Sequence, residues 1–225
     1  MKRTKRLQTV CGQLSPCDTL ADVGCDHGYC TLYALERGLC RRAVISDISR
    51  SSLHKAEELL SSYIAEGRVE SVCCAGLSQV PCNCDQVLIA GMGGEEIVKI
   101  LEGSFLPQAL VLQPMKNTEK VRAFLLEKGY CLVRDFLFYD GPKHYDLLRA
   151  ERGAPPRAYG SLELEFGYDN IHAPLPDFDR FLRGEIENAR GRLEKADASR
   201  AAFQERLRRL EGALAGANVS FTWEV

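Results

Sequence analysis

Acidic residues and glycines alternate in one short segment near the start of the chain, at Asp22, Gly24, Asp26 and Gly28. Residues 19–23 form an apolar run typical of a buried strand, and residues 29–37 continue with helical spacing. Glycines suit a tight turn between strand and helix, because they adopt positive φ and let a ligand approach the backbone closely. The segment therefore predicts a turn that holds a nucleotide-like ligand. The alternative is an ordinary strand, turn and helix in which Asp22 caps the helix.

A further carboxylate, Asp47, ends a second apolar run about 20 residues past this turn, where α/β proteins place a ribose-binding acid. A dinucleotide site has the pattern G-x-G-x-x-G, whereas this turn reads D-x-G-x-D-x-G. The turn is closer to the D-x-G-x-G-x-G of proteins that bind S-adenosylmethionine (SAM). Asp26 replaces the middle glycine and offers a carboxylate to the positively charged methionine end of that cofactor. The two motifs together predict a SAM site.

The composition is that of an ordinary globular protein. The chain has 225 residues, of which 45% are hydrophobic and 27% are charged. Its apolar stretches are shorter than the roughly 20 residues that a membrane span needs, and no signal-type run follows the basic N-terminus. We therefore expect a cytoplasmic protein without a membrane segment, whose 10 cysteines are reduced thiols.

Neither the cysteines nor the histidines have the spacing of a metal or hydrolase site. The most closely spaced cysteines lack paired C-x-x-C motifs: Cys73, Cys74, Cys82 and Cys84. The histidines His54, His144 and His172 match no metal or catalytic-triad spacing, and the chain has no G-x-S-x-G turn. We expect no bound metal and no hydrolase activity.

Strand-sized apolar runs alternate with helical segments up to about residue 150. A helix is expected at residues 5–14, followed by strands near 19–23, 43–47, 69–74, 85–90 and 108–113. Further helices are expected near residues 29–38, 51–66, 93–103 and 117–128. Two last strands, near 130–139 and 144–151, flank a turn at 140–143 and form a hairpin. This order predicts an α/β fold with the Rossmann-like, seven-stranded sheet of class I methyltransferases, rather than an all-parallel dinucleotide-binding sheet.

In such a sheet, ligands bind beyond the carboxyl ends of the strands, where the loops converge. The loop after the third strand contains Ala75 where many methyltransferases have Asp or Asn, so backbone atoms or water are expected to recognise the cofactor adenine. The loop after the fourth strand is the glycine-dense segment 90–94, which includes Met92 and is expected to line the transfer site. Taken alone, this loop also fits a simple packing turn. Gln113 follows the fifth strand and offers polar groups to the edge of a base.

Several motifs occur together in one known family. The segments KRLQTVCGQL, LADVGCDHGY, VISDIS, QVLIAGMGG, LVLQP and DGPKHYDLLRAE, in this order and spacing, resemble the bacterial tRNA (adenine-22) N1-methyltransferase family. The resemblance covers nearly all of residues 5–151 and extends to the tail only in its helical character. It implies a class I methyltransferase domain followed by a helical, coiled-coil-like domain. It also implies SAM as cofactor, tRNA as partner and N1 of adenine 22 as the methyl acceptor.

The expected cofactor-binding residues lie in four loops: Asp22, Gly24, Cys25, Asp26, His27, Gly28, Asp47, Ile48, Ala75, Gly76, Ala90, Gly91, Met92 and Gly93. The expected catalytic residues are Asp26, Tyr29, Met92 and Gln113. Adenine N1 carries an in-plane lone pair, so methyl transfer needs alignment and charge handling more than a strong base. Asp26 either stabilises the product cation or holds the cofactor ammonium, and the sequence leaves both roles open. N1 lies on the Watson–Crick edge, so the base must be unpaired or flipped out.

The net charge of −2 and pI near 6.1 argue against a strongly basic nucleic-acid binder, but folded RNA needs only local positive faces. Two basic groups offer such faces: Lys2, Arg3, Lys5 and Arg6 at the start, and Lys116, Lys120 and Arg122 after the fifth strand. Arginines of the tail offer further contacts. Solvated helix surface is the alternative explanation for each group.

A composition break at residues 153–156 separates two expected domains, 1–152 and 153–225. Residues 153–176 have a linker-like composition, with an extended stretch expected at residues 161–166.

From Leu182 to Leu214, apolar residues recur at alternating steps of four and three, a heptad-type pattern broken by Arg200. The tail is therefore either two antiparallel helices with a break at residues 197–199, or one long helix that associates with another chain. The sequence indicates no obligate protein partner. The heptad-type pattern allows the chain to associate with a second copy of itself through these helices.

Two other classes of function stay open. A methyltransferase that acts on small molecules, proteins or another RNA would also have the SAM turn. Activity on free metabolites would identify a small-molecule methyltransferase. A noncatalytic RNA-binding module would bind tRNA but retain little SAM, and the intact set of Asp22, Gly24 and Asp47 argues against it. A dehydrogenase fits least.

Overall fold

The structure, a computed structural model, describes residues 4–195 and 200–221, with side chains up to residue 217. The chain divides into two compact units, residues 1–133 with 147–156 and residues 134–146 with 157–225. The boundary expected after residue 152 differs from this division. The outer part of the last hairpin packs with the helices of the second unit, since Leu137 lies in their hydrophobic core.

Seven strands form one sheet in the order β3-β2-β1-β4-β5-β7-β6. The strands are β1 (Cys17–Val23), β2 (Cys40–Asp47), β3 (Val69–Cys73), β4 (Gln86–Met92), β5 (Ala109–Pro114), β6 (Tyr130–Asp140) and β7 (Lys143–Arg152). The pairs among β1 to β5 are parallel, whereas β7 pairs antiparallel with β5. The predicted seven-stranded, partly antiparallel sheet is therefore confirmed. The strand order reverses at β1 and β4, and a crevice for ligands forms at such a point.

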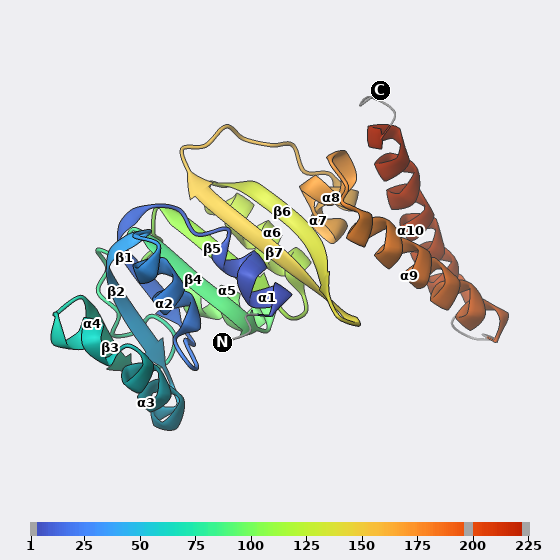
Figure 1. Ribbon diagram of the computed structural model, residues 1–225. Helices are drawn as coiled ribbons and strands as arrows, with labels where there is room; N and C mark the ends of the chain where they lie inside the picture. Colours follow the sequence, from blue (N-terminus) through green and yellow to red (C-terminus); the bar gives the residue numbers. More distant parts are fainter. Residues whose placement is uncertain (1–3, 196–199, 222–225) are drawn as a thin grey trace. The chain divides into compact units, whose positions relative to one another are not determined.

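The described residues of the first unit form six helices: α1 (Lys5–Cys11), α2 (Tyr29–Glu36), α3 (Arg50–Leu59), α4 (Ser61–Ala65), α5 (Gly94–Glu102) and α6 (Thr118–Glu127). Figure 1 shows α1 and α2 on one face of the sheet and α5 and α6 on the other. The central strands are consequently covered on both faces, and Leu88 and Ile89 of β4 are fully buried. The single helix expected at residues 51–66 is wrong. The helix breaks at Leu60, whose backbone departs from helical geometry with φ −102° and ψ 12°. The buried side chain of Leu60 lies close to Gly28.

In the part of the second unit that the structure describes, there are four helices: α7 (Ser161–Phe166), α8 (Tyr168–His172), α9 (Pro176–Glu194) and α10 (Arg200–Phe221). The chain reverses between α9 and α10, which lie side by side (Figure 1). The structure therefore has two antiparallel helices, the first of the two predicted arrangements. The predicted break at residues 197–199 lies outside the described residues. Self-association through these helices stays a prediction.

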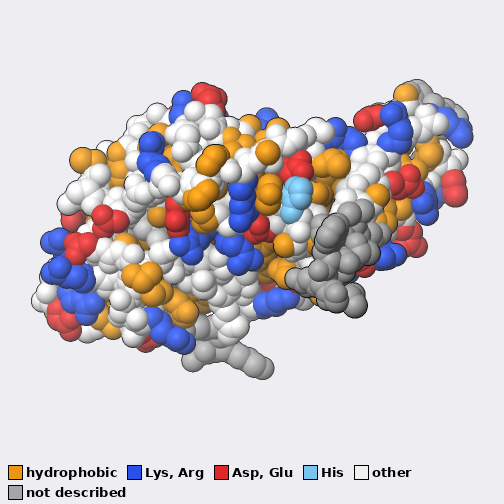
Figure 2. Space-filling view, turned by 90° about the horizontal axis from the view of Figure 1, so that it is seen from above, with side chains coloured by type: hydrophobic (Ala, Val, Ile, Leu, Met, Phe, Trp, Pro, Cys, Tyr) orange, Lys and Arg blue, Asp and Glu red, His pale blue; other side chains and the backbone are white. Residues whose placement is uncertain are grey.

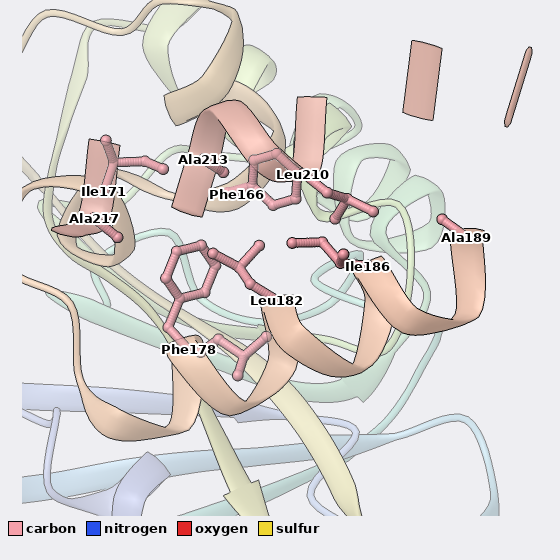
Figure 3. Close-up of a cluster of buried hydrophobic side chains, with 10 residues drawn as sticks. Phe166, Ile171, Phe178, Leu182, Ile186, Ala189, Leu210, Ala213 and Ala217 are labelled. Carbon is pink, nitrogen blue, oxygen red and sulfur yellow. The ribbon is translucent and has the colours of Figure 1, made fainter. Parts of the chain in front are cut away.

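The core of the second unit gathers apolar side chains from all four helices. Figure 3 shows Phe166, Ile171, Phe178, Leu182, Ile186, Ala189, Leu210, Ala213 and Ala217 pointing toward one another. The heptad-type pattern identified Leu182, Ile186, Ala189 and Leu210 but not Phe178, Ala213 and Ala217. The predicted core residue Leu214 is only partly buried. The small alanine side chains let α10 approach its neighbours closely.

The linker-like interpretation of residues 153–176 and the extended stretch at 161–166 were wrong. These residues form the helix α7, whose Phe166 enters the core of the second unit. Glu163 supports the helix start by accepting a 3.0 Å hydrogen bond from the backbone N–H of Gly160, and its other oxygen lies 2.9 Å from Nε2 of His172. Tertiary packing here overrides the local pattern.

All 10 cysteines lie in the described part of the chain and none forms a disulfide. Among the described residues, no group of three or more His, Cys, Asp or Glu side chains is arranged to hold a metal ion. No helix in the described ranges is long and apolar enough to cross a membrane.

Candidate functional site

A cavity of about 820 Å³ lies at the carboxyl ends of β1, β2 and β4. Volumes of this size are usual for small-molecule and cofactor sites. Its walls include most of the predicted site residues: Asp22, Gly24, Cys25, Asp26, His27, Tyr29, Asp47, Ile48, Ala75, Gly76, Ala90, Gly91 and Met92. The loops that are far apart in sequence therefore meet in one place, as the predicted sheet requires.

Asp22 provides the deepest carboxylate in this cavity. It is 5% exposed at the end of β1 and accepts a 2.8 Å hydrogen bond from Oγ1 of Thr31 in α2. Burial raises the pKa of Asp22 to about 6, although the Thr31 hydroxyl acts in the opposite direction. Asp22 therefore lies buried beneath the glycine turn. A cation bound beside it would favour the ionised form of its carboxyl group.

Gly24 is required by both its backbone conformation and its surroundings. Its φ is +69°, and a Cβ atom built on it would lie 2.2 Å from Cε of Met92. The Met92 side chain therefore crosses from the end of β4 onto the turn after β1. Cys25 beside it is buried, and burial raises the pKa of its thiol well above the usual range, so this thiol stays protonated.

Gly28, a predicted cofactor-binding residue, is not among the residues that line the cavity. It adopts a φ of +71° at the start of α2, and a Cβ atom there would lie 3.0 Å from Cβ of Ala56 and 3.1 Å from Cδ1 of Leu60. Gly28 thus permits close packing between the turn and α3 and does not line the cavity.

Asp47 is held in place by the backbone around it. Its two carboxylate oxygens accept hydrogen bonds from the N–H of Ser49, at 2.8 Å, and the N–H of Asp26, at 3.3 Å. These bonds link the end of β2 to the turn after β1 and orient the carboxylate in the cavity wall. The next residue, Ile48, is 77% exposed and forms an apolar rim of the cavity. An acid followed by an apolar rim suits a ribose carrying a flat base.

Asp26, His27 and Tyr29 form a polar and aromatic group at the cavity mouth. Asp26 has a φ of +48°, and its carboxylate lies 2.8 Å from Nδ1 of His27. The rings of His27 and Tyr29 stack with centroids 5.6 Å apart and an interplanar angle of 5°. The Asp26 side chain is 65% exposed, unlike the buried Asp22. The two carboxylates of the turn therefore face different environments.

The glycine-dense loop after β4 is divided between the cavity and the neighbouring helix. Ala90, Gly91 and Met92 line the cavity, whereas Gly93 precedes α5 with an extended backbone and lies outside it. In the loop after β3, Gly76 has a φ of +56°, and its Cβ position lies 2.8 Å from Cγ1 of Ile100. This close approach brings α5 to the wall of the cavity.

The structure does not bring Gln113 into the cavity. Gln113 is fully buried, and Oε1 accepts a 2.7 Å hydrogen bond from Nε of Arg6. Its Nε2 donates to the carbonyl oxygen of Pro114 at 2.9 Å. The amide is therefore occupied by neighbours within the protein and positions Arg6.

Sequence reasoning missed the wall that α1 and α5 provide. These residues are Thr4, Arg6, Leu7 and Val10 near α1, and Glu96, Lys99 and Ile100 of α5. The spacing of Leu7 and Val10 identifies the packed face of α1, but nothing in the sequence indicates that this face borders the site. The expectation for Arg122 was wrong as well, since its side chain is fully buried in α6 and not offered to phosphate.

The geometry now allows comparison with known proteins. A sequence-family model described as "Methyltransferase domain" matches residues 3–148. The chain belongs to this methyltransferase family. One relative, the tRNA (adenine(22)-N(1))-methyltransferase of Bacillus subtilis (strain 168), is 28% identical over 172 residues, which are 74% of this chain and 72% of that protein.

Two solved structures of methyltransferases have the same fold. M. capricolum TrmK in complex with S-adenosyl-homocysteine matches with a TM-score of 0.87 at 20% identity, covering 96% of this chain and 100% of that one. The B. subtilis M1A22 tRNA methyltransferase TrmK matches with a TM-score of 0.82 at 23% identity, covering 94% and 98% of the two chains. These likenesses extend beyond the sheet to the helical residues and confirm the predicted fold.

Proposed function

We propose that this methyltransferase transfers a methyl group from SAM to N1 of adenine 22 in tRNA. The observation that carries the proposal is the relative of that activity, which matches 74% of this chain. The site supports it, because the matched region contains the complete cavity with its two strand-end carboxylates. Because the proposed substrate is tRNA, we also propose that the protein acts in the cytoplasm.

The residues of the cavity fit SAM. Asp47 is positioned to accept hydrogen bonds from the ribose hydroxyls, since its carboxylate is fixed by two backbone N–H groups. Ile48, Ala75 and Gly76 border the place of the adenine, where recognition falls to backbone atoms or water. Asp22 provides negative charge for the ammonium group. Burial raises the pKa of Asp22, and a cation bound beside it favours the ionised carboxylate.

The chemistry requires alignment more than a strong base. When bound, SAM supplies an electrophilic methyl group on a sulfonium centre. The stacked rings of His27 and Tyr29 offer a surface on which an extruded adenine can stack. Asp26 lies exposed at the mouth and counters the positive charge that the base acquires, which assigns the ammonium to the buried Asp22. Met92, which covers Gly24, excludes water from the transfer site.

Binding of tRNA rests on local positive groups. Figure 2 shows Lys and Arg side chains interspersed with Asp and Glu on the face that it draws. Lys116 is exposed beside Met115, an apolar side chain that is itself 50% exposed after β5. An exposed methionine next to a lysine suits a nucleotide, whose base and phosphate need an apolar and a positive partner. Lys120, by contrast, is paired with Glu95.

The test is methyl transfer from labelled SAM to unmethylated tRNA, with the modified nucleoside mapped by mass spectrometry. N1-methyladenosine at position 22, lost when that adenine is replaced, supports the proposal. An Asp47→Asn variant should lose SAM affinity and transfer together. If protein that binds SAM modifies no tRNA, the proposed substrate is wrong and other acceptors must be tested.

A further inference from the structure

Three aromatic rings meet at the surface of the second unit, where the tip of the last hairpin packs against α9. The ring centroid of His144 in β7 lies 4.8 Å from that of Phe181 in α9 and 5.9 Å from that of Tyr139 in β6. Neither contact is a parallel stack, since the interplanar angles are 61° and 63°. His144 is exposed, and Tyr139 and Phe181 are half-buried. These three rings, together with Arg180 beside them, are called the hairpin platform below.

The core and the backbone hold the platform in place. Phe181 stacks on the fully buried Phe178, with ring centroids 6.2 Å apart and an interplanar angle of 19°. The backbone N–H of Tyr139 donates a 2.9 Å hydrogen bond to Oδ2 of Asp177 in the first turn of α9, which ties the hairpin to the helix. The rings are therefore preorganised, and a ligand that stacks on them need not order them first.

Arg180 adds positive charge to the platform. Its guanidinium lies over the ring of Tyr139, 4.1 Å from the centroid. Three other arginines of the second unit lie over aromatic rings, and each of them also pairs with a carboxylate: Arg134, Arg157 and Arg206. Among the described residues, no carboxylate lies within ion-pair distance of Arg180. The charge of Arg180 is therefore not neutralised within the described part of the chain.

His144 differs from the other histidines in the same respect. Each of the other three lies beside a carboxylate: His27, His54 and His172. The ring of His144 contacts other rings and, within residues 4–195 and 200–217, no carboxylate. Two nearby acids of α9 are engaged, since Asp177 binds the hairpin backbone and Asp179 pairs with Arg183. The platform thus combines exposed rings with a cation that has no acidic partner among the described residues.

Exposed rings beside such an arginine suit a nucleotide. A nucleobase is stabilised by stacking on aromatic rings or on a guanidinium plane, and its phosphate is attracted by the positive charge. The loops of folded RNA offer such bases, because nucleotides there are unpaired. The platform belongs to the second unit, whereas the residues that line the cavity belong to the first. It is therefore a separate surface from the methyl-transfer site.

We propose that the hairpin platform binds an unpaired nucleotide of tRNA, with its base stacked on His144 and Phe181 and its phosphate on Arg180. This inference rests on the proposed function, since it takes tRNA as the partner. It makes the platform an anchoring surface that contributes to RNA affinity and not to the chemical step.

The test measures equilibrium binding of unmethylated tRNA to the full chain, without SAM, at several salt concentrations. His144→Ala should weaken binding by about 5- to 100-fold, because a base loses its stacking partner. His144→Phe keeps a ring at this position and should retain most of the affinity. Arg180→Gln should weaken binding and reduce the slope of log K against log salt concentration by about one, since a phosphate contact is lost. His144→Ala should leave that slope unchanged.

Arg190→Gln is the matched control, because Arg190 is an exposed arginine of the same helix that pairs with Glu211. It should change neither the affinity nor the salt dependence. In methyl-transfer assays, His144→Ala and Arg180→Gln should raise KM for tRNA and leave kcat at saturating tRNA unchanged.

The outcomes separate this inference from the proposed function. Wild-type affinity in folded His144→Ala and Arg180→Gln overturns the inference alone, provided that the wild-type protein methylates tRNA. An equal loss of affinity in Arg190→Gln overturns it as well, because the effect would then be one of overall charge. Failure of the wild-type protein to bind or methylate any tRNA would overturn the proposed substrate itself.

Discussion

The hydroxyl of Thr31 donates a 2.8 Å hydrogen bond to the carboxylate of Asp22 in the interior of the first unit. The bond joins the end of β1 to the first turn of α2, on either side of the glycine turn. It partly offsets the cost of burying Asp22, whose pKa is nevertheless raised to about 6 by burial. Ionising Asp22 is therefore costly when no cation is bound beside it.

Replacing Asp22 by Asn should change how stability depends on pH. The folded-state pKa of about 6 lies above the ordinary aspartate value of 3.8, so the folded protein binds more protons between these two pH values. The contribution of Asp22 to stability is full below pH 3.8 and is lost as pH rises through 6. Relative to wild type, Asp22→Asn should gain up to about 3 kcal/mol between pH 4 and pH 7. Urea unfolding across this range measures the difference, and a constant difference would contradict the prediction.

Gly24→Ala should abolish SAM binding, because the new methyl group meets both a positive φ and Cε of Met92 at 2.2 Å. Gly38→Ala is a matched control, since Gly38 has a φ of +65° but nothing within 4 Å of its Cβ position. The control should cost only the backbone strain, about 1–2 kcal/mol, and leave binding intact. Calorimetry and urea unfolding separate the two effects. Normal SAM affinity in Gly24→Ala would show that the turn does not hold the cofactor.

Tyr29→Ala should lower kcat/KM for tRNA by about 10- to 100-fold, because an adenine loses its stacking surface. Tyr29→Phe keeps the ring beside His27 and should retain most activity. Single-turnover methyl transfer, with SAM affinity measured in parallel, tests this prediction. A loss as large in Tyr29→Phe would assign the role to the hydroxyl group instead of the ring.

Gly94→Ala should destabilise the first unit by about 1–3 kcal/mol or more. A Cβ atom there would lie 2.3 Å from the carbonyl oxygen of Asn117 and 2.8 Å from that of Lys116, so two loops would be forced apart. The neighbouring Gly93→Ala is the control, since its closest contact is the flexible end of Lys116 at 3.4 Å. Denaturant midpoints of the two variants should differ clearly, and equal midpoints would contradict this packing argument.

Phe178→Ala should cost about 3–5 kcal/mol, because this fully buried ring fills the centre of the second unit (Figure 3). Leu175→Ala, three residues away, removes a side chain that is 42% exposed and should cost less than about 1 kcal/mol. Thermal unfolding of the full chain measures both. Similar effects of the two substitutions would place the core elsewhere.

Much of the fold and of the site was predictable from local patterns. Apolar runs separated by turn residues predict strands and helices, because each strand or helix must bury one face or stripe. The turn around Gly24 and the acid at Asp47 were predictable for the same reason, since residues at the ends of parallel strands meet at one edge of the sheet. The resemblance to a methyltransferase family rests on these same segments.

Other features depend on contacts between residues remote in sequence. The helix α7 forms because Phe166 enters a core built by α9 and α10, although its own residues alternate like a strand. Gly28 packs against α3 instead of lining the cavity, and which neighbour a glycine meets is decided only when the chain has folded.

The sequence by itself determined the class of fold, the glycine turn and the pair of strand-end acids, because these follow from local periodicity and turn chemistry. Only the tertiary structure brought Arg6 to Gln113, which is 107 residues away, and so decided that α1 forms a wall of the cavity. The reason is physical. Local preferences act over a few residues, whereas burial of Gln113 and the space above Gly91 exist only once distant segments pack together.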